Sequence, residues 1–228
     1  MSQLLVIGYV WPESLSTAAG SHMLSILHAF ISQGWEITFA SAAARNEQMD
    51  DLKSHNVTCV DIELNSSSFD KFVEQLQPSV VLFDRFMTEE QFGWRVEKSC
   101  PQALRVLDTE DLFCLRHARQ QAFKDTGLIN PLLSPSLLFS ELAQREVASI
   151  LRCDLSLIVS EVELQLLTDL FKVAPSLLQY YPLCFSPEAI AQTRPPLEDR
   201  DGFIAIGNYR HAPNWDAVRW LAEAIWPE

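Results

Sequence analysis

Apolar and polar residues follow one another along this chain in blocks that predict strands and helices in turn. Short apolar runs at Leu4–Gly8 and Val80–Asp84 are typical of strands buried on both faces of a parallel sheet. Further strands are predicted at Trp35–Ser41, Val57–Ile62, Ala103–Leu107, Leu155–Val159 and Leu177–Tyr181. Apolar spacing and helix-end signals predict helices from Gly20 to near Gly34 and over Phe69–Leu76, Glu89–Ser99, Asp111–Lys124, Ser136–Arg152 and Ser160–Phe171.

The order of these elements predicts an α/β protein with a Rossmann-like parallel sheet and helices on both faces, because alternating strands and helices form βαβ units. Right-handed crossovers bring the strand-to-helix loops to one edge of the sheet, where such folds bind ligands. Two helix starts have the spacing of a capping box, Thr88 with Gln91 and Ser160 with Glu163. Arg45–His55 is polar and compatible with a helix.

A second strand and helix are predicted after the charged, proline-rich joint at Thr193–Asp201. Phe203–Gly207 reads as a short buried strand closed by glycine, and Pro213 suits the first turn of the following helix. We therefore expect a Rossmann-like domain at residues 1–185, a linker at 186–201, and the first strand and helix of an incomplete second α/β domain at 202–228.

Composition and charge narrow the classes of function. The 228 residues are 48% hydrophobic and carry a formal net charge of −13, which argues against binding to the phosphate backbone of nucleic acids. No apolar run reaches the roughly 18–20 residues that span a bilayer, so we expect no transmembrane segment. No secretion signal is evident, and a cytoplasmic location is the default expectation.

The cysteines give no sign of a metal site or of disulfides. They are Cys59, Cys100, Cys114, Cys153 and Cys184. Their number is odd, and none has the Cys-x-x-Cys or Cys/His spacing that suits zinc. We interpret them as small buried residues in a reducing compartment, and we expect no metal.

Small and charged residues at strand exits are candidates for a binding site. Gly20 and Ser21 let the backbone approach a ligand and favour an anion such as phosphate at the helix start, although a plain flexible loop explains them equally well. Arg85 directly follows a buried strand, and it either orients a polar ligand or forms an ordinary loop ion pair with Asp84. His22, just inside the helix, is interpreted as a surface residue.

Acidic residues gather where the strand Ala103–Leu107 ends, at Asp108, Glu110 and Asp111. Acids at a helix start favour the helix dipole and cap the first turn. Alternatively, one carboxylate takes a proton from an acceptor hydroxyl or binds its polar groups, and Asp108 faces the ligand edge most directly. Arg116, one turn on, either pairs with these acids or contacts a phosphate. A metal-binding Asp-x-Asp fits the spacing poorly.

Two further segments carry weaker signals. Gly207 and Arg210, between the second predicted strand and its helix, are candidates for receiving a diphosphate. Ser160 and Glu163 follow a strand as well, but helix capping explains both of them without a ligand.

Taken in order, these segments resemble those of retaining glycosyltransferases with the GT-B fold, in the large group classed as glycosyltransferase family four. The matching segments are Gly8–Glu13, Ala18–Ser21, Gly34–Phe39, Phe83–Phe86, Glu89–Trp94, Leu107–Leu112 with Leu115 and Arg116, Asp154–Glu161, and Gly207 with Pro213–Asp216. The resemblance implies two facing Rossmann-like domains with the active site in the cleft between them. The first domain mainly holds the sugar acceptor and the second binds the nucleotide sugar. No metal is usually required, and the donor is a co-substrate.

On this resemblance, the chain supplies the acceptor domain and only the beginning of a donor domain, because the Glu-x7-Glu donor segment has no counterpart here. Relatives often carry a histidine where this chain has Phe113, and His117, about one turn later, is not a match. Asp108 and Asp111 are then the catalytic candidates. The isolated chain is expected to be inactive, because a half-site does not position both reactants.

Two functions remain open. A complete form transfers a sugar from a nucleotide-sugar donor to a glycan, lipid-linked or protein acceptor. Alternatively, the chain is a catalytically silent acceptor-binding or interaction domain, which associates with itself or a partner through exposed tryptophans of the C-terminal helix, namely Trp215, Trp220 and Trp226. A nucleotide- or flavin-binding Rossmann protein is a distant third class, since the glycine fingerprint is missing.

Overall fold

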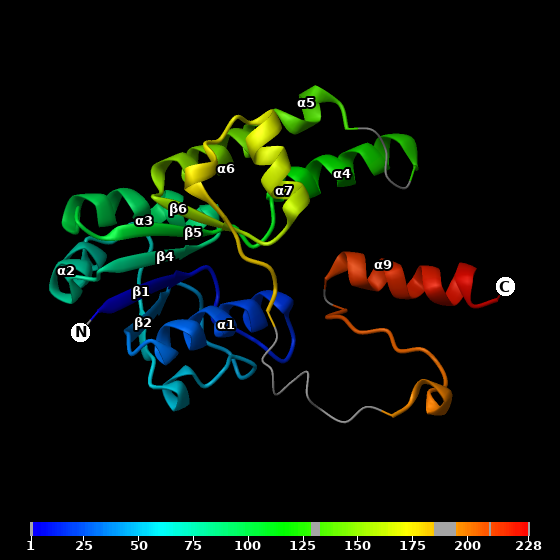
Figure 1. Ribbon diagram of the computed structural model, residues 1–228, viewed down its shortest axis with the longest axis horizontal. Helices are drawn as coiled ribbons and strands as arrows, with labels where there is room; N and C mark the ends of the chain where they lie inside the picture. The colour runs from blue at the N-terminus through cyan, green and yellow to red at the C-terminus, as the bar shows by residue number, and fades with distance from the viewer. Residues whose placement is uncertain (1, 129–132, 185–194, 210, 228) are drawn as a thin grey trace.

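A computed structural model describes residues 2–128, 133–184, 195–209 and 211–227 of this chain (Figure 1). A seven-stranded parallel sheet has the order β3-β2-β1-β4-β5-β6-β7. The strands are β1 (Gln3–Gly8), β2 (Glu36–Ser41), β3 (Thr58–Asp61), β4 (Val80–Asp84), β5 (Leu104–Asp108), β6 (Leu155–Ile158) and β7 (Leu178–Tyr180). The predicted α/β fold with a Rossmann-like parallel sheet is confirmed.

Helices cover both faces of this sheet (Figure 1). They are α1 (Ala18–Ser32), α2 (Ser68–Leu76), α3 (Phe86–Ser99), α4 (Phe113–Thr126), α5 (Pro135–Leu138), α6 (Glu141–Arg152) and α7 (Glu161–Gln165). The described helices also include α9 (Ala212–Trp220), which lies away from the sheet (Figure 1). Two of them continue as single π-helical turns, α7 over Leu166–Leu170 and α9 over Leu221–Ile225. Short 3-10 helices lie at Leu52–His55, Pro175–Leu177 and Leu197–Asp199.

The strands alternate their side chains between two apolar layers, as the period of two requires. Leu5 and Ile7 of β1 pack in the layer beneath α2, α3, α4 and α6. Leu4 and Val6 face the opposite layer, which α1 closes. Because both layers are buried, the central strands read in the sequence as continuous apolar runs.

Several boundaries differ from the prediction. α3 begins at Phe86, so Thr88 lies inside the helix and donates its hydroxyl to the carbonyls of Asp84 and Arg85 instead of capping a later start. The helix predicted over Ser136–Arg152 is divided into α5 and α6. The divide falls where Ser140 caps α6, because its hydroxyl accepts from the amide of Ala143. In Arg45–His55, only the 3-10 turn is helical.

The C-terminal segment departs most from the prediction. Phe203, Ile204 and Ile206 have exposed fractions of 89%, 83% and 86%, and Phe203–Gly207 is not paired as a strand with any described residue. The expectation of a buried strand there is therefore wrong, since the apolar run has no sheet to enter. The helix α9 is confirmed, with proline in its first turn.

The division into two domains stays a prediction, and linker positions 186–194 lie outside the described residues. Among the helices that the structure describes, none combines the length and the apolar character that crossing a bilayer demands.

Candidate functional site

Two carboxylates stand side by side at the carboxyl edge of the sheet. Asp84 ends β4, Asp108 ends β5, and the two are partners in the register of these strands. Each continues the alternation of its strand on the face toward α1, so both side chains turn under that helix. Asp84 is 5% exposed and Asp108 is fully buried. The strand order reverses its direction at β1 and β4, and ligands of open α/β sheets bind at such a switch point.

An imidazole completes this buried pair. His22 lies on α1 on the same face as Ile26, and its Nε2 is 3.4 Å from Oδ1 of Asp108. On the other side, its ring packs on Tyr181, just after β7, with centroids 5.5 Å apart. Neither ring nitrogen has a hydrogen bond of good geometry within the described residues, and Oδ2 of Asp108 has none either. His22 is 2% exposed, so its interpretation as a surface residue is wrong.

Arg85 and Tyr9 form the rim above the carboxylates. The backbone amide of Tyr9 donates to Oδ2 of Asp84 at 2.9 Å. The guanidinium of Arg85 lies 3.5 Å from Oδ1 of the same carboxylate and 5.2 Å from the centre of the Tyr9 ring. Arg85 has a φ of 70°, and its amide donates to the carbonyl of Asp108. A positive φ in a non-glycine residue costs energy and is concentrated at functional sites.

Glu110 is the partly exposed carboxylate of this group. It also has a positive φ, of 61°. Burial, together with the nearby negative charges of Asp108 and Asp84, raises its pKa to about 7. A carboxyl group that titrates near neutral pH is suited to exchange a proton with a ligand. We call His22, Asp84, Arg85, Asp108 and Glu110 the edge cluster.

The charges of the edge cluster act on one another. Burial raises the pKa of Asp84, and the negative charge of Asp108 raises it further against the opposing effect of Arg85. For His22, burial acts to lower the pKa, but contact with Asp108 and the charges of Glu110 and Asp84 outweigh it, so the pKa is raised. The protonation of His22, Asp84 and Glu110 is therefore coupled.

The predicted phosphate site at the start of α1 has another local role. A Cβ on Gly20 would lie 2.4–2.6 Å from backbone atoms of Glu13, so glycine lets the preceding loop pack against the helix. The hydroxyl of Ser21 donates to the carbonyl of Ser14 in the same loop. Both residues thus shape the loop before α1, and their binding to phosphate stays a prediction.

Asp111 and Gly207, two further predicted residues, make their contacts with residues outside the edge cluster. Asp111 forms an exposed ion pair with Arg116 at 3.4 Å, over the first turn of α4. Gly207 packs close to the side chain of Asn214. Arg210 lies outside the described residues. The structure therefore brings Asp108 and Arg85 together but separates Asp111 from them.

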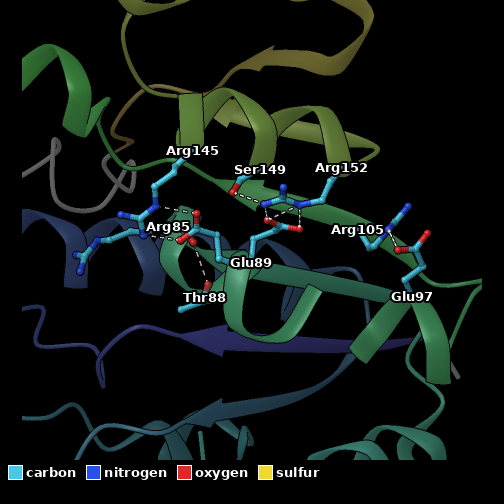
Figure 2. A network of polar contacts seen from close by, with 9 residues as sticks. Arg85, Thr88, Glu89, Glu97, Arg105, Arg145, Ser149 and Arg152 are labelled. Atoms are coloured by element: carbon cyan, nitrogen blue, oxygen red, sulfur yellow. Dashed lines mark hydrogen bonds and ion pairs between the residues drawn. The ribbon is translucent and has the colours of Figure 1, made fainter. Parts of the chain in front are cut away.

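A second polar group ties α3 to α6 (Figure 2). Glu89 is 3% exposed, and both its oxygens accept from the guanidinium of Arg152, which also contacts Ser149. Beside it, Arg145 holds Glu90 through two hydrogen bonds. Each charge in this group already has a partner, so we interpret it as structural.

An open cavity of about 900 Å³ lies between α4 and α9. Phe123 and Leu128 line it on one side, and Trp220 with the ion-paired Arg219 and Glu223 on the other. No residue of the edge cluster lines it. We place the candidate site at the edge cluster. His22, Asp84 and Asp108 carry buried polar atoms without hydrogen-bond partners in the described residues, and His22, Asp84 and Glu110 have shifted pKa values.

Comparison with known proteins bears on the fold. Neither a protein-family model nor a curated protein matches the sequence. The sucrose-phosphate synthase of Thermosynechococcus elongatus aligns over 80% of this chain and 48% of its own, with a TM-score of 0.53 and 12% identity. The lipopolysaccharide outer core galactosyltransferase WaaB aligns over 87% of this chain and 50% of its own, with a TM-score of 0.50 and 13% identity.

The fold of this chain is similar to that of about half of each of these two structures. At these identities the likeness concerns the fold alone, and the chain spans about half the length of either structure. The parallel Rossmann-like sheet expected from the resemblance to GT-B enzymes is thereby shown.

Sequence reasoning missed His22 as a member of the site, and it grouped Glu110 with Asp108 and Asp111 without singling it out. His22 stands four residues before the buried Ile26, and this helical spacing is a signal that places it on the inner face of α1. Glu110 had no such signal, because its pKa depends on neighbours from two strands.

Proposed function

We propose that this chain is the acceptor-binding part of a glycosyltransferase that moves a sugar from a nucleotide-sugar donor to a hydroxyl group of a glycan, lipid-linked or protein acceptor. The observation that supports it most is the edge cluster, at the switch point of a sheet whose fold is that of glycosyltransferases. Carboxylates, an arginine and an aromatic ring at one edge suit the hydroxyl groups and the apolar faces of a sugar.

In the proposed reaction, Glu110 takes the proton of the acceptor hydroxyl. The hydroxyl oxygen forms a bond to the anomeric carbon of the donor, and the bond from that carbon to the nucleoside diphosphate breaks. The diphosphate leaves with the electron pair of that bond. Glu110 is suited to this role because it is partly exposed and its pKa is raised to about 7. The negative charge of the buried Asp108 helps to raise the pKa of Glu110, and His22 opposes this effect.

The donor half of this function is the less supported one. Gly207 and Arg210 remain candidates for the diphosphate, and we propose residues 202–228 as the beginning of the donor domain. Since positioning both reactants supplies much of such catalysis, we expect transfer to need groups beyond those of the edge cluster.

Calorimetric titration of the full chain with a panel of oligosaccharides, nucleotide sugars and nucleoside diphosphates tests this proposal. We expect saturable heat with an oligosaccharide, weakened roughly tenfold by Glu110→Gln. The control is Glu97→Gln, which alters an exposed carboxylate on α3. If the chain binds a nucleotide sugar saturably but binds none of the oligosaccharides, the proposed acceptor site is contradicted.

The alternative, a binding domain without catalysis, is decided by a transfer assay with labelled nucleotide sugars and the oligosaccharide that binds best. Binding without transfer of label favours the silent acceptor-binding domain. Transfer that Glu110→Gln abolishes favours the enzyme.

A further inference from the structure

The start of α4 is held by carboxylates from two other helices. The first amides of a helix have no partner within it, and Leu112, the residue before α4, offers no capping side chain. Instead, Glu146 of α6 accepts from the amides of Phe113 and Cys114, at 2.7 Å each. Glu163 of α7 accepts from the amide of Leu112 at 3.1 Å.

These carboxylates are placed inside the protein at a cost. Glu146 is 4% exposed and Glu163 is 8% exposed, and burial raises the pKa of both. At Glu146, the side chain of Cys114 and the amides of Cys114 and Phe113 oppose this rise, and Asp111 adds to it. At Glu163, the amide of Leu112 opposes the rise, helped by Arg119 and Arg116, and Asp111 again adds to it. A buried carboxylate is tolerated where amides and a helix dipole face it.

The sequence predicts that the side chain of Glu163 caps the start of its own helix, α7. Its spacing from Ser160 is that of a capping box, and the hydroxyl of Ser160 does accept from the amide of Glu163. The reciprocal bond is replaced by the one to Leu112, which joins α7 to α4. Local capping therefore does not explain the orientation of Glu163.

Glu110 lies between two anchored points of the backbone. On one side, the amide and the hydroxyl of Thr109 donate to the carbonyl of Leu157 on β6. On the other, Leu112 is held by Glu163, and the next amides are held by Glu146. Only Glu110 and Asp111 span the interval. A fixed short span forces Glu110 into its positive φ, which a non-glycine residue adopts only where its surroundings determine it.

We propose that Glu146 and Glu163 are positioning residues for Glu110, which they act on through the first turn of α4. The inference rests on the proposed function for the role of Glu110, but not for its geometry. The carboxylate of Glu110 is kept near Asp108 and Asp84 because the loop is clamped at both ends.

The variant Glu146→Gln tests the clamp. Its amide group has a single acceptor oxygen and sets a donor against the second backbone amide, so one of the two bonds is lost. Glu163→Gln is the matched variant, because Glu163 uses one oxygen only and the other has no hydrogen-bond partner in the described residues. Ser140→Ala is the stability control, since it weakens the cap of α6 and leaves the Glu146 carboxylate in place.

The measurement is the pH titration of the Glu110 carboxyl carbon by NMR in the full chain, assigned with Glu110→Gln. In the unmodified protein it should titrate near 7. In Glu146→Gln we expect the midpoint to move toward the ordinary value of 4.5, with little change in Glu163→Gln and Ser140→Ala. An unchanged midpoint in Glu146→Gln overturns the proposal.

Two further points keep the test decisive. Should Glu146→Gln fail to fold, Glu146→Asp replaces it, because it keeps the charge but withdraws it by one methylene; the same two outcomes apply. The titration needs no sugar and no donor. If the protein binds no oligosaccharide but the Glu110 midpoint shifts as expected, the proposed function is contradicted and the positioning role is supported.

Discussion

His22 and Asp108 are in contact beneath the carboxyl edge of the sheet, with Nε2 of the imidazole 3.4 Å from Oδ1 of the carboxylate and no exposed surface on either side chain. The contact joins α1 to the end of β5 across the switch point. It also couples the charge of the buried pair to the partly exposed Glu110. The proton equilibria of the site therefore depend on residues that a ligand does not touch.

Replacing His22 should give a pH-dependent loss of stability. The folded-state pKa of His22 is raised, so its contribution is fully present below the unfolded value near 6.5 and is lost as pH rises through the higher folded value. We expect His22→Gln to lower the free energy of unfolding by about 3 kcal/mol at pH 6 and by less at pH 8.5. Urea unfolding at several pH values measures this.

Replacing Glu110 should stabilise the protein at high pH. Its pKa of about 7 lies above the ordinary 4.5, so the stability tied to its protonated form is lost as pH rises through 7. Glu110→Gln should therefore gain at most about 3 kcal/mol over the unmodified protein at pH 8.5, and little at pH 5. A gain at pH 8.5 together with weakened oligosaccharide binding would show that stability is given up for function. If the difference in stability between Glu110→Gln and the unmodified protein were the same at pH 5 and pH 8.5, the raised pKa of Glu110 would be contradicted.

The ion pair between α3 and α6 should matter more than an exposed one. Arg152→Ala leaves the buried carboxylate of Glu89 without its partner (Figure 2), and we expect a loss of about 2 kcal/mol. Arg219→Ala breaks an exposed pair with Glu223 one turn away and should lower stability much less, because water screens the two charges. Thermal and urea unfolding compare the two. Equal losses would mean that Glu89 is solvated.

The glycine at the start of α1 should resist enlargement. In Gly20→Ala, the new methyl group meets the backbone of Glu13, and we expect a net loss of about 2 kcal/mol because the loop cannot move aside without strain. Ala18→Ser adds one atom at an exposed position of the same helix and should be near neutral. Heat denaturation ranks the two variants, and an unaffected Gly20→Ala would mean that the loop yields easily.

The exposed apolar C-terminal segment should promote self-association. Phe203, Ile204 and Ile206 lie in solvent beside α9, and the ring of Phe203 contacts that of Trp226. Sedimentation should show association that grows with concentration and that Phe203→Asp combined with Ile206→Lys abolishes. Leu15→Asp, at an exposed leucine outside this segment, should leave the association unchanged. A clean monomer at high concentration would contradict this.

The residue pattern alone determined most of the fold and part of the site. Apolar runs located the seven strands, and their alternation with helices predicted a parallel sheet with ligand-binding loops at one edge. The same period of two places Asp84 on one face with Val80 and Leu82, and Asp108 with Val106, so their shared orientation follows from the strands. These features are predictable because they depend on neighbours within one element.

Tertiary structure decided what depends on partners far along the chain. It buried His22 against Asp108, turned Glu163 from its local cap toward α4, and set Glu110 in a left-handed conformation between two anchors. It also left the apolar run at Phe203–Gly207 exposed. The residue pattern of a strand lies within its own segment, but pairing requires a neighbouring strand. Spacing along the chain carries the periodicity of an element, whereas burial, charge coupling and backbone strain arise only when separate elements meet.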